Sequence, residues 1–231
     1  MNTVSASPAE RKPRTLVWDL PTRLFHWLLA GSFAVAWISA ESERWQLVHV
    51  TAGYTVAGLV VFRLLWGLVG TRHARFTDFV RGPRAVLGYL RSLASGRPEH
   101  HAGHNPAGAL AIVGLLALAA LTTATGWANY ADLGGHWLEE VHEALASGML
   151  ALVAVHIVAV VVSSRLHHEN LVASMVHGRK PVPPTEGIRS ARRTVGALML
   201  VAVLGFWWTQ WQSAPANGGA TPFASQAEED D

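Results

Sequence analysis

The chain has 231 residues, of which 50% are hydrophobic and only 15% charged, with 12 His, 10 Trp and no Cys. An average soluble domain carries about 25% charged residues, so this composition argues against an ordinary water-soluble globule. The lack of Cys excludes disulfides, iron–sulfur clusters, thiolate zinc sites, a cysteine nucleophile and thioether-attached haem. A net charge of +2 gives no reason to expect nucleic acid as a partner.

Five segments are predicted to cross a membrane, because a span needs about 20 mostly apolar residues. The first four predict an all-α transmembrane bundle, and the fifth adds a C-terminal transmembrane helix. They cover residues 24–40, 46–70, 106–127, 140–162 and 194–211. A cleaved signal peptide at 24–40 is disfavoured, because Trp and His interrupt its apolar core and further spans follow.

The cations are distributed unevenly about these spans. Sixteen of the 18 Lys and Arg fall before the first span or in the two long connections, 71–105 and 163–193. The opposite side collects acidic residues instead. The positive-inside rule then predicts a cytoplasmic N-terminus and a periplasmic C-terminus. Residues 1–15 form a cytoplasmic segment, 181–193 a basic linker and 194–212 the additional helix, while the small-residue and acidic composition of 213–231 predicts disorder.

Two surface features are predicted from the connections. Residues 83–94 place apolar side chains on one helical face and Arg84 and Arg91 elsewhere, which fits either an interfacial helix on anionic membrane lipid or a solvated loop helix. A belt of aromatic side chains at the membrane interfaces is predicted from Trp18, Trp45, Trp127, Trp137 and Trp211.

Four histidines lie inside predicted spans, where an ionisable side chain is costly and usually functional. His142 and His156 are 14 residues apart on one helix, which gives about 21 Å of rise and nearly the same face. His49 begins the second span at the outer depth, and His26 begins the first at the inner depth. Depth therefore pairs His49 with His142 and His26 with His156.

Two stacked pairs of imidazoles inside a helical bundle are typical of two b-type haems. Zinc fits less well, because each pair offers two ligands where zinc takes three or four. Gly53 and Gly58 would let a flat porphyrin approach the helix backbone. Arg63, 14 residues after His49, would meet a haem propionate. Interhelical hydrogen bonding by the histidines and carbonyl binding by Arg63 are the structural alternatives.

The other eight histidines are predicted to be solvated loop residues, although His100, His101 and His104 are spaced closely enough to bind a metal. Met149 lies between the two ligands of the fourth span, where packing is favoured over ligation of a metal.

Several motifs resemble the bacterial cytochrome b561 family, which includes the b-type cytochrome subunit of nickel–iron hydrogenases. They are the run Val17-Trp18-Asp19-Leu20-Pro21-Thr22-Arg23-Leu24-Phe25-His26-Trp27, then Arg63-Leu64-Leu65-Trp66-Gly67, Phe76-Thr77-Asp78-Phe79-Val80-Arg81-Gly82-Pro83 and Gly103-His104-Asn105-Pro106. The resemblance covers about residues 16–180. It implies a four-helix domain with two haem b groups, ligated by His26, His49, His142 and His156, that exchanges electrons with quinone.

The main hypothesis is a di-haem cytochrome of the bacterial inner membrane that carries electrons between the quinone pool and a periplasmic redox protein, either a hydrogenase or a c-type cytochrome. The family favours a quinone near the inner haem, with His104, Asn105 and Arg63 as candidate contacts. A stand-alone oxidoreductase acting on a small molecule such as superoxide is the enzymatic alternative. A membrane scaffold or transporter is the non-redox one. A second copy of the chain is a further candidate partner.

Overall fold

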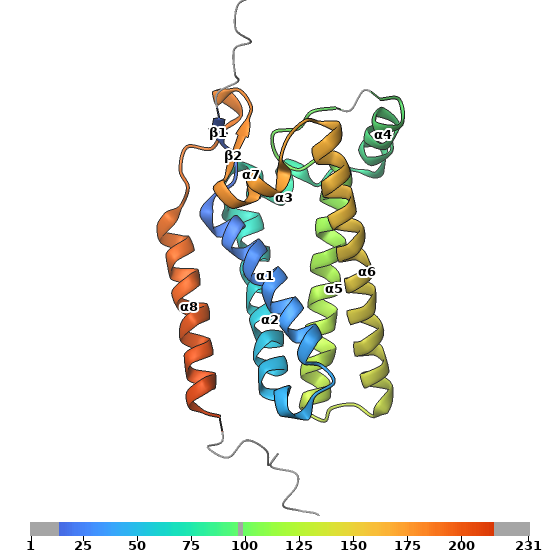
Figure 1. Cartoon of the computed structure of the whole chain (residues 1–231), viewed down its shortest axis with the longest axis vertical. Coiled ribbons are helices and arrows are strands. Elements are labelled where there is room, and N and C mark those ends of the chain that lie inside the picture. The colour runs from blue at the N-terminus through green and yellow to red at the C-terminus, as the bar shows by residue number, and fades with distance from the viewer. Residues whose placement is uncertain (1–13, 97–98, 215–231) are drawn as a thin grey trace, which may run out of the picture.

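A computed structural model describes residues 14–96 and 99–214 of the chain, and five long helices dominate it (Figure 1). They are α1 (Leu20–Ser39), α2 (Gln46–Val69), α5 (Pro106–Tyr130), α6 (His136–Leu166) and α8 (Arg193–Gln212). These match the five predicted spans, although α1 and α6 each begin four residues earlier than expected. Most of the predicted disordered tail, and residues 1–13 of the N-terminal segment, lie outside the described residues.

Four described helices are long and apolar enough to cross a membrane: the helical segments Glu43–Val69, Pro106–Tyr130, His136–Leu166 and Arg193–Gln212. The helix α1 has the 20 residues that a span needs but is not among these four. It packs along α2 and α8. The chain is therefore a multi-pass membrane protein.

The helix starts are set by local sequence. Asp19 caps α1 by accepting a hydrogen bond from the backbone N–H of Thr22 at 2.8 Å, and Asn105 caps α5 through Gly108 at 2.7 Å. A proline follows each cap inside the first turn, where it costs no helical hydrogen bond. Both caps lie at the same end of the bundle, which fixes where the two helices begin.

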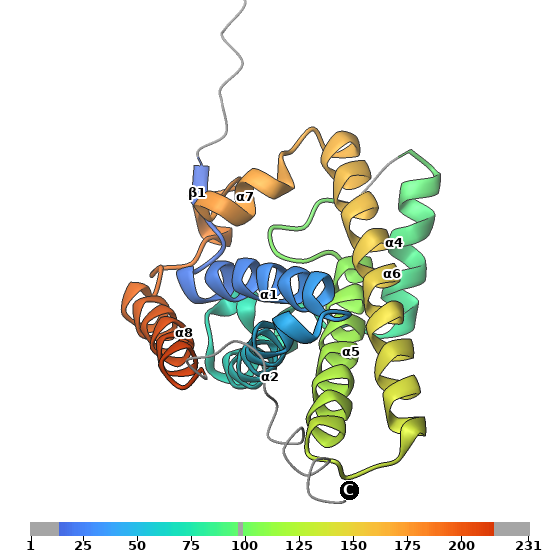
Figure 2. The same cartoon turned by 60° about the horizontal axis from the view of Figure 1, so that its bottom comes forward.

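The four helices α1, α2, α5 and α6 surround one apolar core, and α8 lies outside α1 and α2 (Figures 1 and 2). Trp207 of α8 donates a hydrogen bond to Thr55 of α2 at 2.8 Å. Between these two helices runs an apolar groove of about 590 Å³. The core is built from Phe25, Val56, Leu59, Val60, Leu116, Ala119 and Met149 of these four helices, together with Met199 of α8. The packing predicted for Met149 is confirmed.

One end of the bundle carries nearly all of the short elements, as Figure 1 shows. The strand β1 (Arg14–Leu16) pairs antiparallel with β2 (Arg179–Pro181), with Thr15 opposite Lys180. Three short helices lie nearby: α3 (Phe76–Phe79), α4 (Pro83–Ala94) and α7 (Leu171–His177). Helical turns of the 3-10 type cover Arg72–Ala74 and Pro184–Glu186, and a third, Glu43–Trp45, lies at the opposite end.

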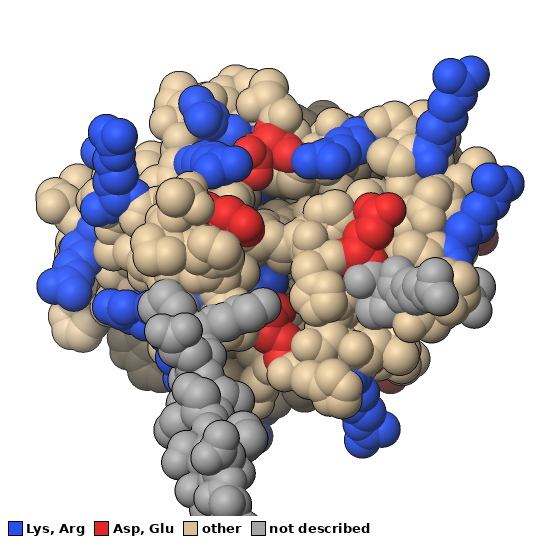
Figure 3. Space-filling view, turned by 90° about the horizontal axis from the view of Figure 1, so that it is seen from above, with Lys and Arg blue, Asp and Glu red and all other residues tan. Residues whose placement is uncertain are grey.

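Figure 3 views the molecule from this end. Lys and Arg side chains spread over the face, with a few acidic side chains between them. The predicted helix at 83–94 is confirmed as α4. Its Leu87 and Leu90 are exposed, while Tyr89 is buried, so α4 presents an apolar strip outward. Whether that strip lies on anionic lipid stays a prediction.

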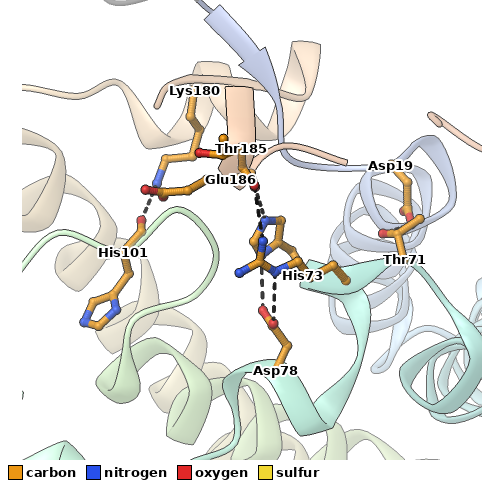
Figure 4. Close-up of polar contacts among 9 residues, drawn as sticks. Asp19, Thr71, His73, Asp78, His101, Lys180, Thr185 and Glu186 are labelled. Carbon is orange, nitrogen blue, oxygen red and sulfur yellow. Dashed lines mark hydrogen bonds and ion pairs between the residues drawn. The ribbon is translucent and has the colours of Figure 1, made fainter. Parts of the chain in front are cut away.

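A polar network ties the connections of this end together (Figure 4). The ring of His73 bonds Asp78 through Nδ1 at 3.1 Å and the backbone carbonyl of Glu186 through Nε2 at 2.7 Å. Lys180 is 4% exposed and donates to the carbonyl of His101 at 3.1 Å while pairing with Glu169 at 3.0 Å. These contacts hold residues from opposite ends of the sequence in one layer.

Candidate functional site

The four histidines of the predicted spans come together as two pairs inside the bundle. The rings of His49 (α2) and His142 (α6) have their centroids 6.3 Å apart. Those of His26 (α1) and His156 (α6) are 6.5 Å apart. Both pairs use α6, where the 14-residue spacing puts them about 21 Å apart along the axis. The pairing expected from depth is therefore the pairing found in the structure.

The outer pair is held by backbone carbonyls. Nδ1 of His49 lies 2.8 Å from the carbonyl oxygen of Ala36, and Nδ1 of His142 lies 3.0 Å from that of Thr122. A histidine that binds a metal usually donates its other ring N–H in this way, which fixes the tautomer and the ring orientation. These two bonds leave Nε2 of each ring available to a metal ion.

The spacing of the rings suits one shared metal ion. A metal–imidazole bond is about 2 Å long, and the ring centre lies about 1 Å further back, so two rings on one ion have centroids roughly 6 Å apart. The inner pair has an additional polar atom to satisfy, because Nδ1 of His26 is buried without a hydrogen-bond partner among the described residues. The pairs therefore fit a haem iron, which each pair of imidazoles would hold. They fit zinc poorly, since no group of three or more potential metal-binding side chains occurs in the described part of the chain.

The two candidate glycines have different surroundings. A Cβ atom on Gly53 would meet nothing within 4 Å, which leaves room beside the helix one turn after His49. Gly58 lines the groove between α2 and α8 instead, so the expectation that it faces the haem is wrong. Nine residues from His49 turn the helix by about 180°, which puts Gly58 on the opposite face.

Arg63 is buried at the inner end of α2, with 2% of its surface exposed. Its guanidinium carbon lies 4.8 Å from the ring centre of Phe76 and 5.7 Å from that of Phe79. Its Nη1 atom has no hydrogen-bond partner among the described residues. Cation–π contacts of this kind stabilise a guanidinium, but they leave its N–H groups unbonded.

Three residues near this arginine depart from the sequence-based expectations. Trp18 is 5% exposed, so it does not belong to the aromatic belt, whereas Trp45, Trp127, Trp137 and Trp211 are exposed. His73 is buried, so it is not a solvated loop residue. His104 packs between Trp18 and Phe79, with ring centroids 4.5 and 4.7 Å away. Burial, and to a lesser degree the neighbouring charge of Arg63, lowers the pKa of His104 to about 3, so its ring is neutral at physiological pH.

The sequence does not predict that Trp18 and His104 pack together, because both lie in connections, where periodicity says nothing about packing. Their signal was the motifs that carry the resemblance, which contain both residues.

The comparison with known families matches these positions. A sequence model described as prokaryotic cytochrome b561 covers residues 17–178, which includes all four paired histidines and Arg63. The chain belongs to the prokaryotic cytochrome b561 family. It is accordingly a b-type cytochrome of the membrane that carries haem b and acts in electron transfer. The helix α8 lies beyond the matched residues.

Curated relatives of this cytochrome share about a quarter of its residues. A probable Ni/Fe-hydrogenase B-type cytochrome subunit of Bradyrhizobium diazoefficiens is 26% identical over 221 residues, covering 76% of this chain and 90% of the relative. A subunit of the same name from Azotobacter chroococcum is 27% identical, covering 70% of this chain and 86% of the relative. A probable Ni/Fe-hydrogenase 1 B-type cytochrome subunit of Escherichia coli is 25% identical, covering 50% of this chain and 60% of the relative. No solved structure matches the chain.

Proposed function

We propose that the cytochrome binds two haem b groups, one held by His49 and His142 and the other by His26 and His156. The observation that carries the proposal is the presence of two imidazole pairs, 6.3 and 6.5 Å between ring centres, at two depths of one helix. The proposed di-haem domain comprises residues 16–180. Haem supplies one-electron chemistry at the iron, and the protein sets its position and surroundings.

The residues around each pair have different tasks. The carbonyls of Ala36 and Thr122 orient the rings of the outer pair. Gly53 leaves open space beside α2, where a porphyrin face could rest against the backbone. Met149 is buried on α6 between the two histidine positions, so it keeps water out of the region between the two sites. A dry, apolar interior of this kind favours electron transfer over binding of other ligands.

The orientation follows from charge. The end of the bundle that carries β1, β2, α3, α4 and α7 is the cationic one, and the positive-inside rule places it in the cytoplasm. The His26–His156 pair then lies toward the cytoplasm and the His49–His142 pair toward the periplasm of a bacterial inner membrane. The two sites together would span most of the bilayer.

This arrangement suits electron exchange between membrane quinone and a redox protein on the periplasmic side. The names of the curated relatives favour a hydrogenase as that protein, with a c-type cytochrome as the other candidate. The quinone is proposed near the inner site, with Asn105 as its candidate contact. Membrane lipid surrounds the bundle.

The test is to purify the chain and measure its haem by pyridine haemochrome and by reduced-minus-oxidised spectra. The wild type is expected to hold two haem b per chain. His142→Ala should lose the outer haem and His156→Ala the inner one, because each removes one of the two imidazoles that would hold that haem. The remaining haem should keep its own redox potential.

His136→Ala is the matched control, because His136 lies on the same helix but is 81% exposed. It should keep both haems. A wild-type protein with one haem or none would contradict the proposal. So would loss of both haems in each ligand variant while helix content, measured by circular dichroism, stays unchanged.

A further inference from the structure

The inner end of the bundle contains a buried positive charge that forms no ion pair with the described residues. Arg63 is 2% exposed, and among the described residues no carboxylate lies within ion-pair distance of it. The buried carboxylate of Asp19 is engaged elsewhere, since its oxygens accept from the N–H of Thr22, the indole of Trp66 and the hydroxyl of Thr71. An unpaired charge in an apolar interior is costly, so a bound anion would relieve a real penalty here.

Two further polar nitrogens beside Arg63 are also unsatisfied. Nε1 of Trp18 and Nδ1 of His104 are buried and have no hydrogen-bond partner in the described part of the chain. Their rings are 4.5 Å apart, and Phe79 contacts both His104 and the Arg63 guanidinium. An indole N–H and a guanidinium can only donate hydrogen bonds, so the missing group is an acceptor.

The position of these donors relates them to the inner histidine pair. Trp18 stands two residues before α1, which carries His26 in its second turn. Arg63 stands 14 residues after His49 on α2, so it points to nearly the same side of that helix as His49 but at the inner depth. His26 itself has an unpartnered Nδ1. All the unsatisfied nitrogens therefore lie at the end of the bundle where the inner haem is proposed.

We infer that Arg63, Trp18 and His104 form a carboxylate-binding pocket that holds a propionate of the inner haem. The inference rests on the proposed di-haem function and names the residues that anchor one of the haems. A carboxylate suits the pocket because it neutralises the guanidinium and offers two oxygens to several donors. A quinone carbonyl offers one neutral oxygen and leaves the charge of Arg63 uncompensated.

The experiment compares the binding of haem with and without its carboxylates, in the wild-type pocket and in Arg63→Gln. The full-length chain, stripped of haem, is reloaded with protohaem or with its dimethyl ester, which lacks both carboxylates. In the His142→Ala background only the inner site is filled. Esterification should weaken binding to the wild-type pocket by about tenfold or more, as expected for a charge-assisted hydrogen bond. In Arg63→Gln, protohaem and its dimethyl ester should bind almost equally.

Trp18→Phe removes one donor and should reduce the ester effect only in part. It also supplies the comparison if Arg63→Gln folds poorly. Arg165→Gln, which removes an exposed cation from the same end of α6, should leave the ester effect intact. A second readout is the redox potential. Arg63→Gln should lower the redox potential of the inner haem, because removal of a nearby positive charge makes the reduced iron less stable. The potential of the outer haem should stay unchanged.

The inference is overturned if esterification weakens binding equally in wild type and Arg63→Gln. It is overturned in favour of a quinone contact if the ester has no effect in the wild type while Arg63→Gln weakens binding of a short-chain quinone. A wild-type chain that takes up no haem at the inner site would instead reject the proposed function on which the pocket depends.

Discussion

The imidazole of His142 lies directly against Gly126 of α5. A Cβ atom built on Gly126 would stand 2.8 Å from Cε1 and 3.1 Å from Nδ1 of that ring, closer than side chains tolerate. The same ring bonds the carbonyl of Thr122 one turn earlier on α5. The backbone of α5 thus fixes both the position and the tautomer of His142.

This contact predicts that Gly126→Val displaces the His142 ring. The added side chain needs the space that the imidazole fills, so the haem proposed at His49 and His142 should be lost or its redox potential shifted, while the haem proposed at His26 and His156 stays. Haem content and a redox titration of the purified variant measure this. Gly148→Ala on α6 is the control, because a Cβ there meets nothing within 4 Å. Two haems with wild-type potentials in Gly126→Val would contradict the idea.

How far the sequence predicts this site depends on helical geometry. The pairing of His49 with His142 and of His26 with His156 follows from rise and rotation per residue, because all four lie in long apolar helices. The same geometry separates Gly58 from His49, because nine residues rotate the helix by about 180°. Distance along the helix alone therefore does not predict which glycine faces the paired histidines.

The connections could not be predicted in this way. The strand pair β1 and β2 joins Thr15 to Lys180, and no local pattern links residues so far apart. The burial of His73 depends on the carbonyl of Glu186, more than 100 residues away. The frequency of tryptophan at membrane interfaces predicts an interfacial position for Trp18, yet the folded connections bury it.

Asp19 joins three elements, and its loss should be costly. It caps α1 and accepts hydrogen bonds from Trp66 at 3.1 Å and Thr71 at 2.7 Å. Asp19→Ala removes a cap and leaves two donors unpaired, which should lower the free energy of unfolding by roughly 2–4 kcal/mol. Denaturation by SDS in mixed micelles measures the change. Asn170→Ala, which removes the exposed cap of α7, should cost about 1 kcal/mol or less. Equal losses in both variants would argue against the buried network.

Lys180 and Glu169 form a buried ion pair whose partners depend on each other. Their nitrogen and oxygen are 3.0 Å apart, and their side chains are 4% and 15% exposed. Lys180→Met leaves the carboxylate buried without a partner and should cost about 3–5 kcal/mol. Adding Glu169→Gln should recover much of that loss, because the unpaired charge is removed. Unfolding of the two single variants and the double variant tests this coupling, and strictly additive losses would exclude it.

The histidines in the connections at the cationic end of the bundle predict how stability changes with pH. Burial lowers the pKa of His101 and of His167 below the ordinary value of about 6.5, and nearby cationic groups, Arg81 for His101 and His100 for His167, act in the same direction. The unfolded chain therefore binds more protons than the folded chain as the pH falls below about 6.5, so stability should decline in that range. Above it, this contribution is fully present.

The double variant His101→Gln, His167→Gln should flatten this dependence. Its unfolding free energy is compared with that of the wild type at pH 5 and pH 7.5. The four paired histidines are the same in both proteins, so the difference between the proteins reports His101 and His167 alone. His136→Gln is the control, because that exposed ring lies at the other end of the bundle. The variant should lose less stability than the wild type on acidification, since fewer protons are taken up on unfolding. An identical loss in all three proteins would show that burial of His101 and His167 does not govern the acid response.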